Sequence, residues 1–175
     1  MTEKKFMNSV ANGQVDILEQ FIYLLGDMKI DYCVIGGLAV NAYVEPVVSL
    51  DLDIIIVMNE LDKLLKAIKD KKLFTLKQFS HSVNLGSLKS DLRIQLQTDY
   101  RYQTFIDKAI NKKVMGYEMK VAILEDVLQG KIWAYLDEER RKSKRQKDLA
   151  DIFRLVETYP YLRDLLPEEI KVTGI

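Results

Sequence analysis

Apolar residues recur along the chain with two different periods, and each period predicts one type of element. Spacings of three and four residues predict helices over residues 14–29 and 60–71. Short apolar runs predict strands over residues 32–35 and 50–58. Residues 91–97 alternate strictly, which predicts a strand with one buried face. Its apolar positions are Leu92, Ile94 and Leu96, and its polar positions are Asp91, Arg93, Gln95 and Gln97.

The remaining segments are shorter, and helical spacing dominates after residue 122. Residues 73–88 predict strand pieces, with turns at Asn84 and Gly86. Further helices are expected over residues 38–43, 102–110, 123–137, 144–158 and 160–166, and a hairpin is expected over 114–122 around Gly116.

These elements together predict an α/β fold, with a mixed β-sheet flanked by helices and a C-terminal helical extension. A length of 175 residues favours a single domain over residues 1–175, with a core of about 10–122 and an extension of about 123–175.

Composition limits the classes of function. Lys and Arg total 26, as do Asp and Glu, so any site for a polyanion must be local. The single cysteine, Cys33, excludes an internal disulfide and fits a cytoplasmic protein. The strongest apolar run, Ile54 to Met58, is far shorter than the roughly 20 residues of a membrane helix, so no membrane partner is expected.

Two aspartates lie within an isoleucine-rich strand. Asp51 and Asp53 are two residues apart, so their side chains project from the same face, with Ser49 alongside. Two adjacent carboxylates in a buried strand repel each other and lose hydration. A divalent cation removes both costs, and Mg²⁺ prefers oxygen ligands at roughly 2.1 Å. The pair therefore predicts a magnesium site.

A glycine pair precedes these aspartates. Gly36 and Gly37 follow a predicted strand and open a predicted helix. Glycines allow close approach of the backbone to a ligand, and a helix N-terminus offers free N–H groups to phosphate. A nucleoside triphosphate held there could reach metal ions on the next strand, so the order of these motifs predicts nucleotide chemistry.

The segment resembles the nucleotidyltransferase superfamily of DNA polymerase beta, whose pattern is Gly-Gly or Gly-Ser followed by Asp-x-Asp. It is most similar to the AbiEii-type nucleotidyltransferases, the toxins of type IV toxin–antitoxin systems. Their Lys-x-x-Ala and Lys-Asp-x-x-Asp helices correspond here to Lys131-Ile-Trp-Ala and Lys147-Asp148-Leu-Ala-Asp151. The resemblance covers roughly residues 32–158.

The resemblance implies roles for individual residues. Asp91 would be a third carboxylate, so that two magnesium ions would be held by Asp51, Asp53 and Asp91. Asp51, Asp53, Asp91 and Lys131 would be catalytic, and the nucleotide would bind Gly36, Gly37, Ser49, Lys131, Lys147 and Asp148. The family often carries an arginine where this chain has Val47, so a phosphate-facing charge is either missing or supplied elsewhere.

Two charged features allow alternative interpretations. Lys131 falls on the apolar stripe of its helix, where it either pairs with Asp148 across two helices or points at the triphosphate. Residues 140–147 contain six basic residues, which form either a solvated loop or a polyanion contact beside the cleft.

The implied reaction transfers a nucleoside monophosphate from a nucleoside triphosphate to an acceptor hydroxyl. By resemblance the acceptor is RNA, such as a tRNA end, and the protein is a toxin with a cognate antitoxin. One alternative is an enzyme acting on a small molecule, in the manner of the aminoglycoside and lincosamide nucleotidyltransferases. The other is an inactive nucleotidyltransferase fold that serves as a binding protein.

Overall fold

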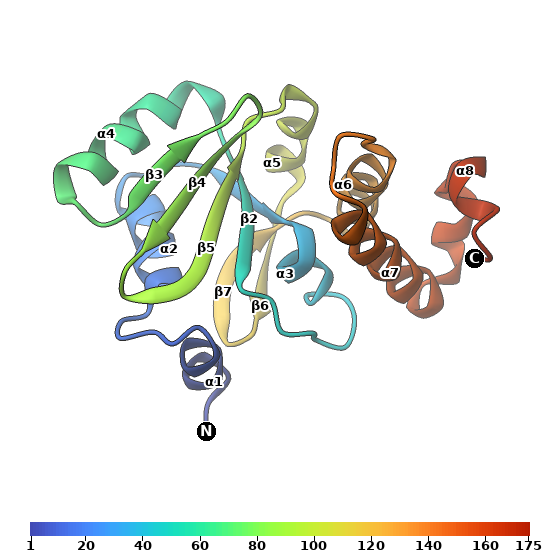
Figure 1. The fold of residues 1–175 in the computed structure, drawn as a ribbon, viewed down its shortest axis with the longest axis horizontal. Coiled ribbons are helices and arrows are strands. Elements are labelled where there is room, and N and C mark those ends of the chain that lie inside the picture. The colour runs from blue at the N-terminus through green and yellow to red at the C-terminus, as the bar shows by residue number, and fades with distance from the viewer.

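A seven-stranded mixed sheet forms the centre of the computed structural model, which describes all 175 residues (Figure 1). The strand order is β3-β4-β5-β2-β1-β7-β6. The pairs β2–β5 and β1–β7 are parallel, and the other neighbours are antiparallel. The strands are β1 (Tyr32–Ile35), β2 (Asp51–Ile56), β3 (Thr75–Gln78), β4 (Ser82–Ser87), β5 (Ser90–Gln97), β6 (Ile110–Val114) and β7 (Tyr117–Val121).

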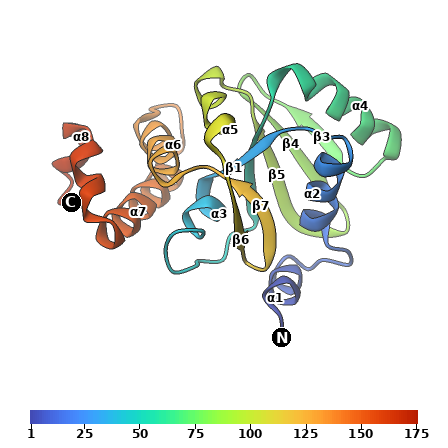
Figure 2. The ribbon, with the colours of Figure 1, turned by 180° about the vertical axis from the view of Figure 1, so that it is seen from behind.

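Helices cover one face of the sheet and extend beyond its side. Seen from behind, α2 and α4 lie over the face formed by β3, β4 and β5, whereas α6, α7 and α8 lie to the other side (Figure 2). None of the helices is long and apolar enough to cross a membrane. The α-helices are α1 (Glu3–Val10), α2 (Ile17–Asp27), α3 (Gly36–Val40), α4 (Leu61–Lys71), α5 (Thr104–Lys108), α6 (Leu124–Leu136), α7 (Lys142–Thr158) and α8 (Glu168–Lys171), and the short 3₁₀ helices are η1 (Met58–Glu60), η2 (Tyr100–Tyr102) and η3 (Pro160–Leu165).

The alternation in β5 and β2 divides the sheet into a buried and a polar face. Leu52, Ile54 and Ile94 are fully buried in a core cluster of 45 residues. The intervening residues of β2 and β5 point to the opposite face, where no helix covers strands β3 to β5 (Figure 1). The predicted α/β fold, with a mixed sheet flanked by helices and a helical C-terminal part, is confirmed.

Some local predictions are wrong. Asn84 and Gly86 are not turns: both lie inside β4, where the register shifts between Leu85 and Ser87. The short helix begins at Gly36 itself, two residues earlier than the spacing predicts. The hairpin around Gly116 is confirmed, and both of its turn residues, Met115 and Gly116, have positive φ as a tight hairpin turn requires.

Candidate active site

The two aspartates of β2 form the floor of a cleft between the sheet and the C-terminal helices. The cleft consists of two adjoining hollows of about 70 and 110 Å³, both lined by Asp53, Lys131 and Asp148. Asp51 is paired in register with Arg93 of β5, and Asp53 with Gln95. Asp51 and Asp53 therefore project side by side into the cleft, as their spacing predicts.

Of the two carboxylates, Asp53 is the one whose negative charge its surroundings disfavour more. Burial raises the pKa of Asp53; Lys131 acts in the opposite direction, and the neighbouring Asp51 adds to the rise. Asp53 forms no ion pair, whereas Asp51 Oδ1 lies 2.8 Å from Arg93 Nε. A carboxylate that is desolvated and unpaired is the kind of group that a cation stabilises.

The glycine pair allows the chain to pass close to Asp53. Gly36 has a φ of 69°, and a Cβ at this position would overlap the Asp53 carboxylate. Gly37 lines the cleft next to Ser49, whose Oγ accepts a hydrogen bond of 3.3 Å from the Asp51 backbone N–H. Ser49 thus orients the start of β2, and the two glycines keep the space above the aspartates free of side chains.

Lys131 is buried at the centre of an ion-pair cluster between α6 and α7. Its Nζ lies 3.0 Å from Asp148 Oδ1 and 2.7 Å from Asp151 Oδ2. Arg140 binds the other oxygen of Asp148 at 2.7 Å. Burial opposes the charge on Lys131, but Asp151 and Asp148 outweigh it, so the pKa of Lys131 is raised. The structure shows the predicted pairing of Lys131 with Asp148, adds Asp151, and still places Lys131 on the cleft wall.

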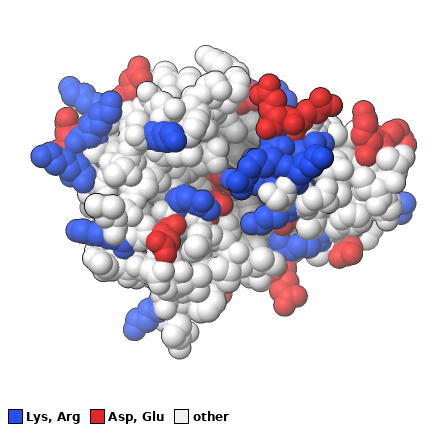
Figure 3. Space-filling view, in the orientation of Figure 1, with Lys and Arg blue, Asp and Glu red and all other residues white.

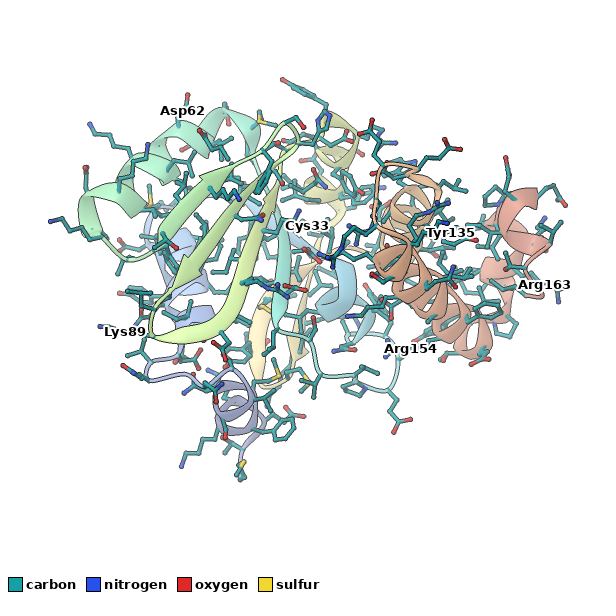
Figure 4. All side chains as sticks on the ribbon, viewed as in Figure 1. Cys33, Asp62, Lys89, Tyr135, Arg154 and Arg163 are labelled. Carbon is teal, nitrogen blue, oxygen red and sulfur yellow. The ribbon has the colours of Figure 1, made fainter.

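Arg154 supplies a positive charge beside Val47. Arg154 lies on α7 (Figure 4). Its Nη2 donates hydrogen bonds to Glu45 O at 2.6 Å and Asn41 Oδ1 at 3.4 Å, and its Nη1 lies 2.7 Å from Asp151 Oδ1. Arg154 and Val47 line the same hollow. Arg154 thus places a guanidinium beside Val47, where it is paired with Asp151, and sequence spacing did not reveal this contact.

Two lysines of α7 face the cleft without an acidic partner. Lys144 and Lys147 line the larger hollow with Lys131 and Arg140. In the space-filling view, lysines and arginines gather where the sheet meets the C-terminal helices (Figure 3). Since Lys144 and Lys147 form no ion pair, their charges remain available to an anion. The basic run therefore borders the cleft, and its last six residues, 142–147, all belong to α7.

Asp91 does not join the two aspartates, contrary to the prediction. It lies on the expected strand and face, but two residues before Arg93, the register partner of Asp51. Its Oδ2 instead accepts a hydrogen bond of 2.6 Å from Asn12 at an exposed position. Gln95 is the β5 residue opposite Asp53, so an amide stands where a third carboxylate was expected.

The start of β2 offers oxygen atoms that suit Mg²⁺. Asp51, Asp53 and the Ser49 hydroxyl offer oxygen atoms, and Mg²⁺ completes its shell with water and phosphate. No group of three or more acidic, histidine or cysteine side chains with metal-site geometry occurs.

Comparison with known proteins identifies the fold. No protein-family model matches the chain, and no curated protein matches it significantly. The solved structure of the lincosamide antibiotic adenylyltransferase LnuA, bound to lincomycin, shares 12% sequence identity with a TM-score of 0.56, over 82% of this chain and 98% of that one.

Two further structures are similar over most of their length. The antibiotic-resistance factor ANT(2″)-Ia in complex with adenylyl-2″-tobramycin shares 15% identity with a TM-score of 0.60, over 91% of this chain and 93% of that one. An antigenic nucleotidyltransferase-like protein from Paracoccidioides brasiliensis shares 21% identity with a TM-score of 0.55, over 95% and 84%. The chain therefore has the nucleotidyltransferase fold.

Proposed function

We propose that the protein transfers a nucleoside monophosphate from a nucleoside triphosphate to an acceptor hydroxyl and releases pyrophosphate. The observation that carries this proposal is the opposition of charges in the cleft. Asp51 and Asp53 form its floor, and the unpaired Lys144 and Lys147 stand on the facing wall. A triphosphate could bind the two lysines directly and the two aspartates through a bridging cation.

Each residue of the cleft has a distinct task in this reaction. Asp51 and Asp53 would hold Mg²⁺, which when bound neutralises phosphate charge and favours loss of the acceptor hydroxyl proton. Gly37 leaves room for the phosphates, and Lys144 and Lys147 would bind their non-bridging oxygens. Lys131 holds α6 against α7 and adds positive charge behind the phosphates.

The resemblance of the motifs supports an RNA acceptor, such as a tRNA end, and a toxin role with a cognate antitoxin. Induced expression in a bacterium should then arrest growth, and expression of Asp53→Asn should not. Equal growth of the two cultures would leave the toxin hypothesis without support.

A second candidate is a small antibiotic-like acceptor, because two of the similar structures are complexes with lincomycin and with adenylyl-2″-tobramycin. Resistance assays with both compounds, in cells that express the wild type or Asp53→Asn, distinguish this candidate. A resistance increase specific to the wild type would support it.

Calorimetry tests the nucleotide site itself. Titration of the protein with each nucleoside triphosphate should show binding that requires Mg²⁺ and is lost in Asp53→Asn. Lys113, an exposed residue of the edge strand β6, gives the control variant Lys113→Gln, whose binding should be unchanged. Absence of magnesium-dependent binding for all nucleotides would contradict the proposal.

A further inference from the structure

A polar groove runs from the proposed active site across the uncovered face of the sheet. The register of β2, β5, β4 and β3 places alternate residues of all four strands on this face. They line a hollow of about 290 Å³ that Asp51 and Gln95 share with the active-site cleft. Its other polar side chains are Thr75, Lys77, Asn84, Arg93 and Lys144.

The groove carries positive charge. Lys77, Arg93 and Lys144 contribute cations, and Asp51 is the only acid in its lining. Asp51 is already matched by Arg93 at 2.8 Å, so the groove as a whole has excess positive charge. A polycationic acceptor such as an aminoglycoside would meet repulsion here, whereas an acceptor with phosphates would be attracted.

Three aliphatic residues, Leu76, Leu85 and Ile94, contribute the apolar part of the groove lining. None of its lining residues is aromatic, and its leucines Leu76 and Leu85 belong to positions that alternate with the polar ones. Leu85 is buried against the opposite face.

The geometry points to this groove as the acceptor subsite, occupied by a single strand of nucleic acid whose terminal hydroxyl lies at Asp51. The inference rests on the proposed function and names its acceptor class. Lys77 on β3 is three strand spacings from β2, roughly 14 Å, so it would bind a phosphate upstream of the reacting end. Lys144 lines both hollows and would contact the strand close to the triphosphate.

Charge reversal at Lys77 tests this inference away from the nucleotide site. Lys77 is exposed, does not line the active-site cleft and forms no ion pair, so Lys77→Glu should fold normally. Fluorescence anisotropy would measure binding of labelled single-stranded RNA and DNA oligonucleotides across a salt series. We expect affinity to fall about tenfold and the salt slope to decrease by about 1. Lys113→Glu, on the opposite edge strand β6, is the control and should bind as the wild type does.

Calorimetry with Mg²⁺ and nucleotide on the same variants separates the two proposals. Unchanged nucleotide binding together with oligonucleotide binding that is equal in Lys77→Glu and wild type would overturn the groove assignment alone. Absence of nucleotide binding to the wild type would instead contradict the proposed function. The RNA and DNA arms show which strand is preferred, and binding of neither would overturn the inference.

Discussion

Replacement of Lys131 by methionine removes one charge from a buried cluster and keeps an unbranched side chain of similar length. The Lys131 side chain is 9% exposed and contacts Asp148 and Asp151, which are 3% and 16% exposed. After the substitution, Asp148 retains Arg140, and Asp151 retains Arg154. The variant therefore removes one ion pair from each aspartate, and each aspartate keeps an ion pair with an arginine.

The size of the effect follows from this remaining pairing. Removal of one partner from a buried ion pair typically destabilises a protein by about 3–5 kcal/mol. Because each aspartate keeps an arginine, we expect the lower end, about 3 kcal/mol in the free energy of unfolding. For a chain of this length that corresponds to a fall in Tm of roughly 6–12 °C.

Urea denaturation measures this free energy, and the chain carries its own reporter. Trp133 is the only tryptophan, and it stacks on Phe105 with ring centroids 5.7 Å apart. Its fluorescence therefore follows the packing of α6. The pKa of Lys131 is raised above its usual 10.5, so its stabilising charge is fully present below that pH and is lost only as pH rises through the folded value. Measurements at pH 7–8 thus report the whole contribution.

Lys120→Met is the matched control. Lys120 pairs with Asp31 at 2.9 Å, but the two side chains are 44% and 68% exposed. Such a pair contributes less than about 1 kcal/mol. If Lys131→Met costs no more than this control and yet abolishes nucleotide binding, Lys131 serves the triphosphate directly, and its role in holding α6 to α7 is refuted.

Three further variants probe the cleft. Asp53→Asn should raise the Tm of the metal-free protein by a few degrees, because it removes a buried carboxylate whose raised pKa shows that the fold disfavours its charge. Mg²⁺ should stabilise the wild type only. Thermal unfolding with and without the ion checks both points. Asp91→Asn should retain transfer activity in a turnover assay, since Asp91 lies outside the cleft, and inactivity would restore it to the mechanism. Lys147→Gln should weaken triphosphate binding by about tenfold in calorimetry while the Tm stays within about 1 °C, because Lys147 has no ion pair to lose; equal affinity would remove it from the site.

Periodicity alone is enough to place the strand that carries Asp51 and Asp53. The alternation around Asp51 and Asp53 and the apolar stripe that contains Lys131 both reflect local geometry, which depends only on neighbouring residues. The same local geometry assigned the polar face of β5 correctly. It does not fix the register between β5 and β2, which places Gln95 rather than Asp91 opposite Asp53, and the role predicted for Asp91 rests on the family resemblance alone.

The sequence pattern also does not predict contacts between distant segments. Arg154 reaches Glu45 across 109 residues, and nothing in the spacing of either segment indicates that they meet. The turns predicted at Asn84 and Gly86 failed for a related reason. Pairing with β3 and β5 on both sides holds β4 extended despite its turn-forming residues, so tertiary context overrides local preference.

A transfer assay with nucleoside triphosphates labelled at either the α- or the γ-phosphate tests the proposed reaction itself. It would be run with Mg²⁺ and an oligonucleotide acceptor on the wild type and Asp53→Asn. We expect the α-label to enter the acceptor, the γ-label to be released as pyrophosphate, and both events to disappear in Asp53→Asn. Transfer of the γ-label to the acceptor, or equal α-label transfer by the two proteins, would contradict the proposed reaction.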